Sequence, residues 1–169
     1  MKLILRCNGR ASGGTLKTFY LSSEEKTRVL AIAFGALLKK GDIILLKGSI
    51  GAGKSFFARA LIQSLQTIPE NIPSPTFTLV QTYDTRLGEI WHADLYRLKL
   101  AEELEELGLF EAFDNAISLV EWPEIMEASM PSRCLEIEFS ATSFAGERII
   151  KISTKNIRWR SRLSELDAL

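Results

Sequence analysis

The segment GSIGAGKS at residues 48–55 carries the clearest chemical pattern in the chain, because it fits G-x-x-x-x-G-K-[ST] at every fixed position. Glycines let backbone N–H groups turn inward around phosphate oxygens, and a helix that begins directly afterwards adds the positive end of its dipole. In such a loop Lys54 reaches the outer phosphates, and the hydroxyl of Ser55 is a ligand for Mg²⁺. The segment therefore predicts a site for a nucleoside triphosphate.

Two carboxylates are candidates to complete this site, since a phosphate loop needs an acid at the end of a neighbouring strand to hold Mg²⁺ or orient a water. Asp94 ends the segment IWHAD at 90–94, and Glu121 follows the apolar run AISLV at 116–120. The second run is the more continuous and so the better central parallel strand. Spacing alone leaves open which acid is the metal ligand and which is the base, and either could instead cap the next helix.

One absent motif and two residues, His92 and Trp122, remain to be weighed beside the loop and the acids. The Asn/Thr-Lys-x-Asp element that usually reads guanine is absent from the sequence, which disfavours a GTPase. His92 is the only histidine, and a single histidine is more often a packed or hydrogen-bonded structural residue than a general base. Trp122, which precedes Pro123, is compatible with either a core position or an exposed contact.

The elements that must position these residues alternate between strands and helices. A buried strand at 42–47 leads into the phosphate loop, and a helix at 56–66 follows it. The pattern predicts further helices at about 22–40, 101–107 and 156–166, and two hairpins at 76–81/89–95 and 135–139/148–153. This order predicts an α/β fold, a single-domain P-loop NTPase-like sandwich with a mixed parallel and antiparallel sheet.

Length, charge and cysteine content limit the possibilities. The 169 residues suit one domain over 1–169, with residues 1–15 as an N-terminal extension. Lys+Arg and Asp+Glu are both 21, so no net charge draws the protein to nucleic acid or membrane. Cys7 and Cys134 match no metal or disulfide spacing and are expected to be free thiols. No segment is typical of a signal peptide or a membrane span, so we expect a soluble, cytoplasmic protein.

Four segments in a fixed order carry a resemblance to a known family. They are GSIGAGKS at 48–55, SPTFTLV at 74–80, HADLYR at 92–97 and LVEWPE at 119–124. Over about residues 19–153 the chain closely resembles the TsaE (YjeE) family, the ATPase subunit of bacterial tRNA threonylcarbamoyladenosine synthesis. The phosphate loop is generic, whereas the other three segments in this order are highly specific. Ser55 stands where threonine is usual, and Ala93 where a larger residue is common.

The resemblance implies a cytoplasmic protein that binds ATP and Mg²⁺ and hydrolyses ATP. Because the sequence has no obvious arginine finger or lid, we expect weak ATPase activity from the protein alone. Such a protein supports multiple turnover by two partner subunits that modify adenosine 37 of tRNA, and it meets tRNA only indirectly, through that complex, with no role for a membrane. By motif, Lys54, Asp94 and Glu121 are the implied catalytic residues, with Asp94 as the acid that supports hydrolysis. Ser55 and Glu121 are the implied magnesium ligands. The implied nucleotide contacts are Glu24, Gly48, Gly51, Ala52, Gly53, Lys54, Ser55, Phe56 and Thr76.

Two other classes of function compete with this interpretation. The first is a stand-alone kinase for a small molecule or nucleoside, although kinases of this size usually carry an arginine-rich lid. Here the segment after the two acids is a proline-bounded turn and a hairpin. The second is a nucleotide-binding regulatory module without catalysis, which the presence of both acids argues against. Incubation with ATP and candidate acceptors separates these classes, because a kinase yields a phosphorylated product and an ATPase yields free phosphate.

Overall fold

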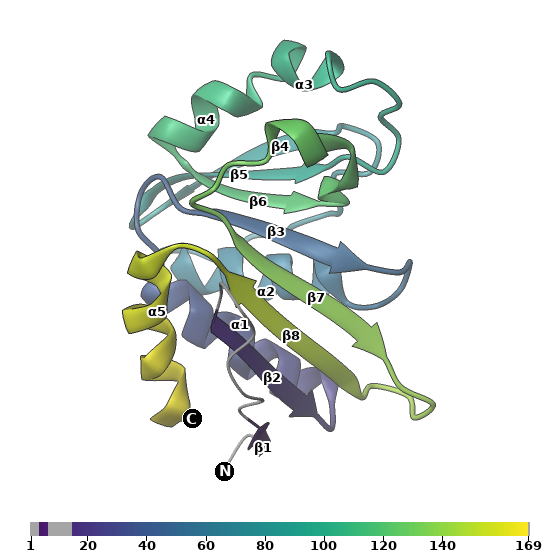
Figure 1. Ribbon diagram of the computed structural model, residues 1–169, viewed down its shortest axis with the longest axis vertical. Coiled ribbons are helices and arrows are strands. Elements are labelled where there is room, and N and C mark those ends of the chain that lie inside the picture. Colours follow the sequence, from purple (N-terminus) through teal and green to yellow (C-terminus); the bar gives the residue numbers. More distant parts are fainter. Residues whose placement is uncertain (1–3, 7–14, 169) are drawn as a thin grey trace.

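The computed structural model describes residues 4–6 and 15–168, which build one eight-stranded sheet in the order β1-β2-β8-β7-β3-β6-β5-β4 (Figure 1). The strands are β1 (Ile4–Arg6), β2 (Thr15–Leu21), β3 (Ile43–Gly48), β4 (Val80–Thr85), β5 (Gly88–Asp94), β6 (Ile117–Glu121), β7 (Leu135–Ala141) and β8 (Arg148–Thr154). The helices are α1 (Glu24–Leu37), α2 (Lys54–Leu65), α3 (Glu103–Glu106), α4 (Leu109–Asn115) and α5 (Ile157–Ser164), with 3₁₀ segments η1 (Pro123–Ser129) and η2 (Glu165–Ala168).

The centre of the sheet is parallel and its two flanks are antiparallel. Strand β3 pairs in parallel with β6 and with β7, and β5 pairs in parallel with β6. The pairs β1–β2, β2–β8, β7–β8 and β4–β5 are antiparallel. The predicted mixed sheet is therefore confirmed. Because parallel strands end at the same edge, β3, β5 and β6 deliver their last residues side by side.

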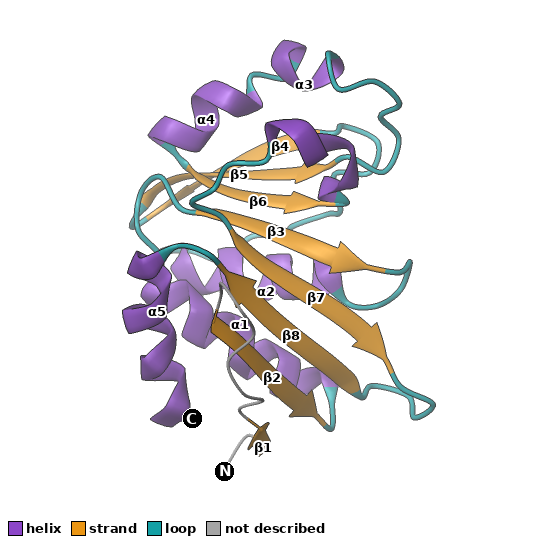
Figure 2. Ribbon diagram, in the orientation of Figure 1, coloured by secondary structure: helices purple, strands orange, loops and turns teal. Residues whose placement is uncertain are grey.

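Both faces of the central strands are buried, which explains their unbroken apolar sequences. In β3, Ile44 and Leu46 belong to the cluster that also contains side chains of α1, α2 and α5. Ile43 and Leu45 belong to the cluster on the opposite face, with side chains of α3, α4 and η1. Helices accordingly cover the sheet from two sides (Figure 2). This three-layer packing holds the carboxyl end of β3 in a fixed position.

The helix α1 begins as predicted but ends earlier. The hydroxyl of Ser23 caps its start by accepting a hydrogen bond from the N–H of Lys26 at 3.3 Å. The helix ends at Leu37 and not near residue 40, because the N–H of Lys39 donates to the Asp42 carboxylate at 2.7 Å and the chain turns there. The acidic helix predicted at 101–107 is similarly shorter, spanning Glu103–Glu106.

The strand predicted at 76–81 is wrong in its first half. Residues 75–78 form a turn, Leu79 has φ of 65°, and β4 begins only at Val80. The N–H of Leu79 donates to the carbonyl of Pro75 at 2.7 Å, which closes the turn. The alternation of threonine with apolar residues resembles a strand, but the Thr76 hydroxyl is used in a hydrogen bond to Asp94 instead.

Part of the predicted N-terminal extension can be compared with the structure. Residues 4–6 form β1, which pairs antiparallel with β2, whereas residues 1–3 and 7–14, including Cys7, lie outside the described residues. Cys134 is a buried free thiol. Within residues 4–6 and 15–168, no helix is long and apolar enough to cross a membrane.

Candidate nucleotide-binding site

The phosphate loop joins β3 to α2, and its glycines are required by its backbone. Gly48, Gly51 and Gly53 have φ values of 133°, 74° and 108°, which side chains of L-residues rarely adopt. A Cβ atom on Gly48 would also lie 2.3 Å from the carbonyl oxygen of Phe139 on β7. Any larger residue at Gly48 would push the loop away from the sheet, so the loop geometry depends on these glycines.

The ammonium group of Lys54 lies inside this loop. Its Nζ donates to the carbonyls of Gly48 at 2.7 Å and Ser49 at 2.9 Å, and it lies 3.7 Å from the centroid of the Trp122 ring. Burial lowers the pKa of Lys54, while the neighbouring carboxylates, Glu121 foremost, oppose that shift. Among the described residues, no carboxylate oxygen is in direct contact with Nζ of Lys54, so this cation is suited to an incoming anion.

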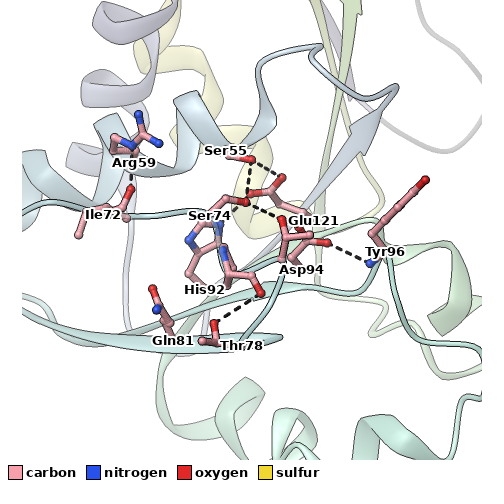
Figure 3. A network of polar contacts seen from close by, with 12 residues as sticks. Ser55, Arg59, Ile72, Ser74, Thr78, Gln81, His92, Asp94, Tyr96 and Glu121 are labelled. Atoms are coloured by element: carbon pink, nitrogen blue, oxygen red, sulfur yellow. Dashed lines mark hydrogen bonds and ion pairs between the residues drawn. The ribbon is translucent and has the colours of Figure 1, made fainter.

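The two predicted acids lie next to each other at the ends of adjacent strands. The parallel register of β5 and β6 pairs Asp94 with Glu121, and the register of β3 and β6 pairs Leu46 with Glu121. The exposed fractions of Asp94 and Glu121 are only 3% and 1%. Buried carboxylates require hydrogen-bond donors, and each finds them within the site (Figure 3).

Glu121 links the phosphate loop to the buried histidine. Its Oε2 accepts a hydrogen bond from the Ser55 hydroxyl at 2.8 Å, and its Oε1 lies 2.9 Å from Nε2 of His92. A carboxylate only accepts, so Nε2 carries the proton of this contact. Nδ1 of His92 is buried and has no partner among the described residues. The histidine therefore orients Glu121, which favours the structural interpretation of His92.

Asp94 is bonded to the segment that follows α2. Its Oδ2 accepts from the Thr76 hydroxyl at 2.7 Å, and its Oδ1 accepts from the backbone N–H of Tyr96 at 3.0 Å. The hydroxyl of Ser74 lies 3.0 Å from that of Thr76 and 3.5 Å from that of Ser55. A single chain of hydroxyl and carboxylate groups thus connects Asp94 to the phosphate loop (Figure 3).

Most of the predicted site residues therefore come together at one edge of the sheet. The Ser55 hydroxyl and the Glu121 carboxylate are adjacent oxygen donors, and this donor set fits Mg²⁺, which takes one or two protein ligands and completes its shell with phosphate oxygens and water. Glu24 and Phe56 lie outside the hydrogen-bond network. Phe56 on α2 faces Arg28 of α1, whose guanidinium carbon is 5.3 Å from the ring centroid.

Two further residues lie near the loop: Trp122, which the family resemblance places beside the site, and Arg148, which was not assigned from sequence. Trp122 has φ of 56°, and its ring packs on Lys54 and, at 4.9 Å between centroids, on Tyr96. Arg148 begins β8, and its Nε would lie 3.3 Å from a Cβ atom on Gly53. No local motif marks Arg148, because only the pairing of β8 with its neighbours brings it to the phosphate loop.

Comparisons with known proteins place this site in context. The family model of the threonylcarbamoyl adenosine biosynthesis protein TsaE matches residues 21–150. The chain is 47% identical over 117 residues to a tRNA threonylcarbamoyladenosine biosynthesis protein TsaE of Rickettsia bellii, covering 69% of this chain and 81% of that relative. It is 36% identical over 114 residues to the protein of the same name from Bacillus subtilis, covering 67% and 70%. The crystal structure of Bacillus subtilis YdiB superposes with a TM-score of 0.77 at 28% identity, covering 94% of this chain and 98% of that one.

Proposed function

The chain belongs to the TsaE family of threonylcarbamoyl adenosine biosynthesis proteins, and we propose that it is the subunit of this system that binds and hydrolyses ATP with Mg²⁺. Membership in the family places the protein in tRNA threonylcarbamoyladenosine biosynthesis. The observation that carries the proposal is the 2.8 Å contact between Ser55 and Glu121, beside Lys54 and at the carboxyl ends of parallel strands. Open α/β sheets bind ligands at this edge.

Each residue of the site has a separate part in this proposal. The backbone of residues 48–53 and the Lys54 ammonium bind the phosphates, and Ser55 and Glu121 hold the metal. The bound ion supplies positive charge that stabilises the phosphates during transfer. Asp94 orients the attacking water and supports hydrolysis, and its bond to Thr76 supports a switch-like role for residues 74–76.

The nucleoside is assigned to the side of the loop that faces α1. Glu24 lies in the first turn of α1, and Phe56 follows Ser55 on α2 and faces Arg28. Arg148, which lies against Gly53, adds a cation at the same side of the loop. We therefore include Arg148 among the proposed nucleotide contacts, together with Gly48, Gly51, Ala52, Gly53 and Thr76.

Slow turnover by the isolated subunit follows from this arrangement. Phosphoryl transfer depends on positioning and charge stabilisation, and a site with an incomplete set of cations around the transferred group turns over slowly. We assign completion of the site to two partner subunits of the modification complex in the cytoplasm. In this scheme ATP hydrolysis supports repeated cycles of modification, and tRNA is met through the complex.

A calorimetric titration and a product analysis test the nucleotide part of the proposal. The purified protein is titrated with ATP, ADP and GTP, with and without Mg²⁺, and we expect tighter binding of adenine than of guanine nucleotides. Labelled ATP is then incubated with candidate acceptors, and we expect the label in free phosphate. Label transferred to a small molecule or nucleoside would instead support the kinase alternative.

Reconstitution tests the assignment to the modification complex. Partner subunits, tRNA, ATP and threonylcarbamoyl-adenylate are combined with this protein or with its Lys54→Ala variant. We expect modification over many turnovers only with the unmodified protein. If modification proceeds equally well without the protein and with the variant, the proposed role in turnover is wrong, even when ATP binding is intact.

A further inference from the structure

A second charged region lies at the opposite end of β3 from the phosphate loop. The turn after α1, the segment before β7 and the helix α5 together enclose a hollow of about 350 Å³. In Figure 1 this is the end of β3 from which its arrow starts, next to α5. Five cations and one acid line the hollow: Lys39, Lys40, Arg133, Arg158, Arg162 and Asp42.

Two of these cations are structural, because the fold neutralises them. Arg162 forms a fork to the Asp42 carboxylate, with a distance of 2.8 Å from Nη2 to Oδ1, and donates to the carbonyl of Leu37 at 2.9 Å. Its guanidinium also stacks on the Trp159 ring, 3.8 Å from the centroid. Arg133 donates to the carbonyl of Phe113 at 2.8 Å and forms an ion pair with Asp114. These contacts build the wall of the hollow.

The other three cations have no such partners. The side chains of Lys39, Lys40 and Arg158 are exposed, and none forms an ion pair in the part of the chain that the structure describes. Like charges around one hollow repel one another, and an anion placed among them removes that repulsion. Lys155, which precedes α5, and Arg160, which lies in it, are also exposed and add positive charge next to the hollow.

We propose that this α5 basic pocket, formed by Lys39, Lys40 and Arg158 on the wall of Arg133 and Arg162, binds phosphate groups of an RNA backbone. The inference goes beyond the proposed function, in which tRNA is met through partner subunits. A net charge of zero does not oppose it, because the distribution of charge decides where a polyanion binds.

The chemistry of the pocket favours RNA over an acidic protein surface. Protein interfaces have apolar or aromatic centres with few charges, whereas nucleic-acid interfaces are polar and strongly positive. The one aromatic side chain that lines the pocket, Trp159, is only 1% exposed and is covered by Arg162, so no ring is offered to a base or to a protein side chain. Contacts to phosphates without base reading are therefore expected.

The expected signature is a moderate affinity with a defined salt dependence. Three free cations that each neutralise one phosphate give a slope of log K against log salt of about −2.1 to −2.7. Raising salt from 50 to 200 mM should then weaken binding by about 20- to 40-fold.

Fluorescence anisotropy with a labelled tRNA transcript, without nucleotide, tests the proposal on the full chain. The pocket variant is Lys39→Glu/Lys40→Glu, and the matched control is Arg97→Glu/Lys99→Glu, which changes the net charge by the same amount at two exposed cations that form no ion pair among the described residues. We expect the pocket variant to lose at least about tenfold in affinity and to show a shallower salt slope, and the control to lose less than about threefold. Thermal unfolding checks that both variants fold, and the milder Arg158→Ala variant should lose about twofold or more.

Several outcomes would overturn the inference. They are no binding of tRNA by the unmodified protein at 50 mM salt, equal losses in the two double variants, or pyrophosphate binding that the pocket variant abolishes while tRNA binding persists. Equal affinity for poly-glutamate and tRNA would indicate an acidic protein as the ligand. Lys54→Ala separates this inference from the proposed function, because it should remove ATP binding and leave tRNA binding intact.

Discussion

Charged side chains at the two ends of β3 have opposite environments. At the carboxyl end, Lys54, Asp94 and Glu121 are almost completely buried. Lys54 donates to carbonyls of the loop, and Asp94 and Glu121 accept hydrogen bonds from Thr76 and Ser55. At the amino end, Lys39 and Lys40 are exposed and form no ion pair among the described residues. Burial makes an unpaired charge costly, whereas water tolerates it. Substitutions at the first end should therefore affect ligand binding and internal structure together, whereas substitutions of Lys39 and Lys40 at the second end should affect ligand binding alone.

The largest expected effect is a difference in ATP affinity between variants of the lysines at the two ends of β3. Lys54→Ala removes the buried ammonium from the phosphate loop and should weaken ATP binding by about 100-fold or more, since charge-assisted hydrogen bonds to phosphate are lost. Lys39→Ala at the other end should change ATP affinity by less than about twofold. Isothermal titration calorimetry with Mg²⁺ measures both. Unchanged ATP affinity in Lys54→Ala would contradict the nucleotide site itself.

The second prediction divides the roles of the two buried acids. Asp94→Asn keeps the shape of the side chain and should slow hydrolysis by about 100-fold or more, with ATP affinity nearly intact, because its role is in the transition state. Glu121→Gln should instead raise the Mg²⁺ concentration needed for half-maximal activity by about tenfold. Single-turnover assays across a magnesium series measure both effects. Loss of nucleotide binding in Asp94→Asn but not in Glu121→Gln would reverse the assignment.

The site at the carboxyl end of β3 was largely predictable from sequence, and the basic pocket at its amino end was not. The phosphate loop and the two acids are marked by local patterns, namely a glycine spacing and apolar runs that each end in a carboxylate. Arg148 and the α5 basic pocket have no such pattern, because residues more than ninety positions apart form them only when the sheet assembles. The net charge of zero gives no sign of the pocket either, because acidic residues elsewhere in the chain balance its positive charge.

Local patterns also failed where a tertiary contact overrides them. The threonines at 76 and 78 suggested a strand, yet the Thr76 hydroxyl bonds to a carboxylate eighteen positions away and the chain turns there. The helix α4 was not predicted, because its seven residues are too few for a clear periodicity. Its buried Leu109 and Phe113 are defined only by packing on the sheet face that includes Val120.

The third prediction concerns how residues at the amino end of β3 contribute to the stability of the protein. Arg162→Ala removes the fork to Asp42 and the stacking on Trp159, both partly buried, and should lower the free energy of unfolding by about 1–3 kcal/mol. Lys40→Ala should change it by less than about 0.5 kcal/mol, since that side chain is exposed and unpaired among the described residues. Urea unfolding followed by circular dichroism compares them. Equal effects would show that Arg162 is no more structural than Lys40.

The fourth prediction tests whether Arg148 belongs to the nucleotide site. Its guanidinium lies against Gly53, so Arg148→Ala should weaken ATP binding by about tenfold, and Arg148→Lys should recover part of the loss. AMP, which lacks the outer phosphates, shows whether Arg148 acts on them: a loss for ATP only places the contact at those phosphates, and an equal loss for both places it nearer the nucleoside. Arg160→Ala on α5 is the matched control and should leave both affinities unchanged. No loss for either nucleotide would remove Arg148 from the site.

The smallest expected effect is a pH dependence of the free energy of unfolding, which we expect from the buried Lys54 at the carboxyl end of β3 and not from the exposed lysines at its amino end. Burial lowers the pKa of Lys54 below its ordinary value of 10.5, so at neutral pH the folded protein holds a charge that it disfavours relative to the unfolded chain. As pH rises through the lowered pKa toward 10.5, the unfolded state binds more protons at this position than the folded state, and stability at this position increases. The variant Lys54→Met lacks this group, so the difference in free energy of unfolding, unmodified protein minus variant, should become more favourable to the unmodified protein between neutral pH and about 10.5. Urea unfolding of both proteins at a series of pH values measures the trend, with Lys40→Met as the exposed control that should show none. A difference that falls as pH rises would mean that the nearby carboxylates outweigh burial and hold the Lys54 ammonium charged.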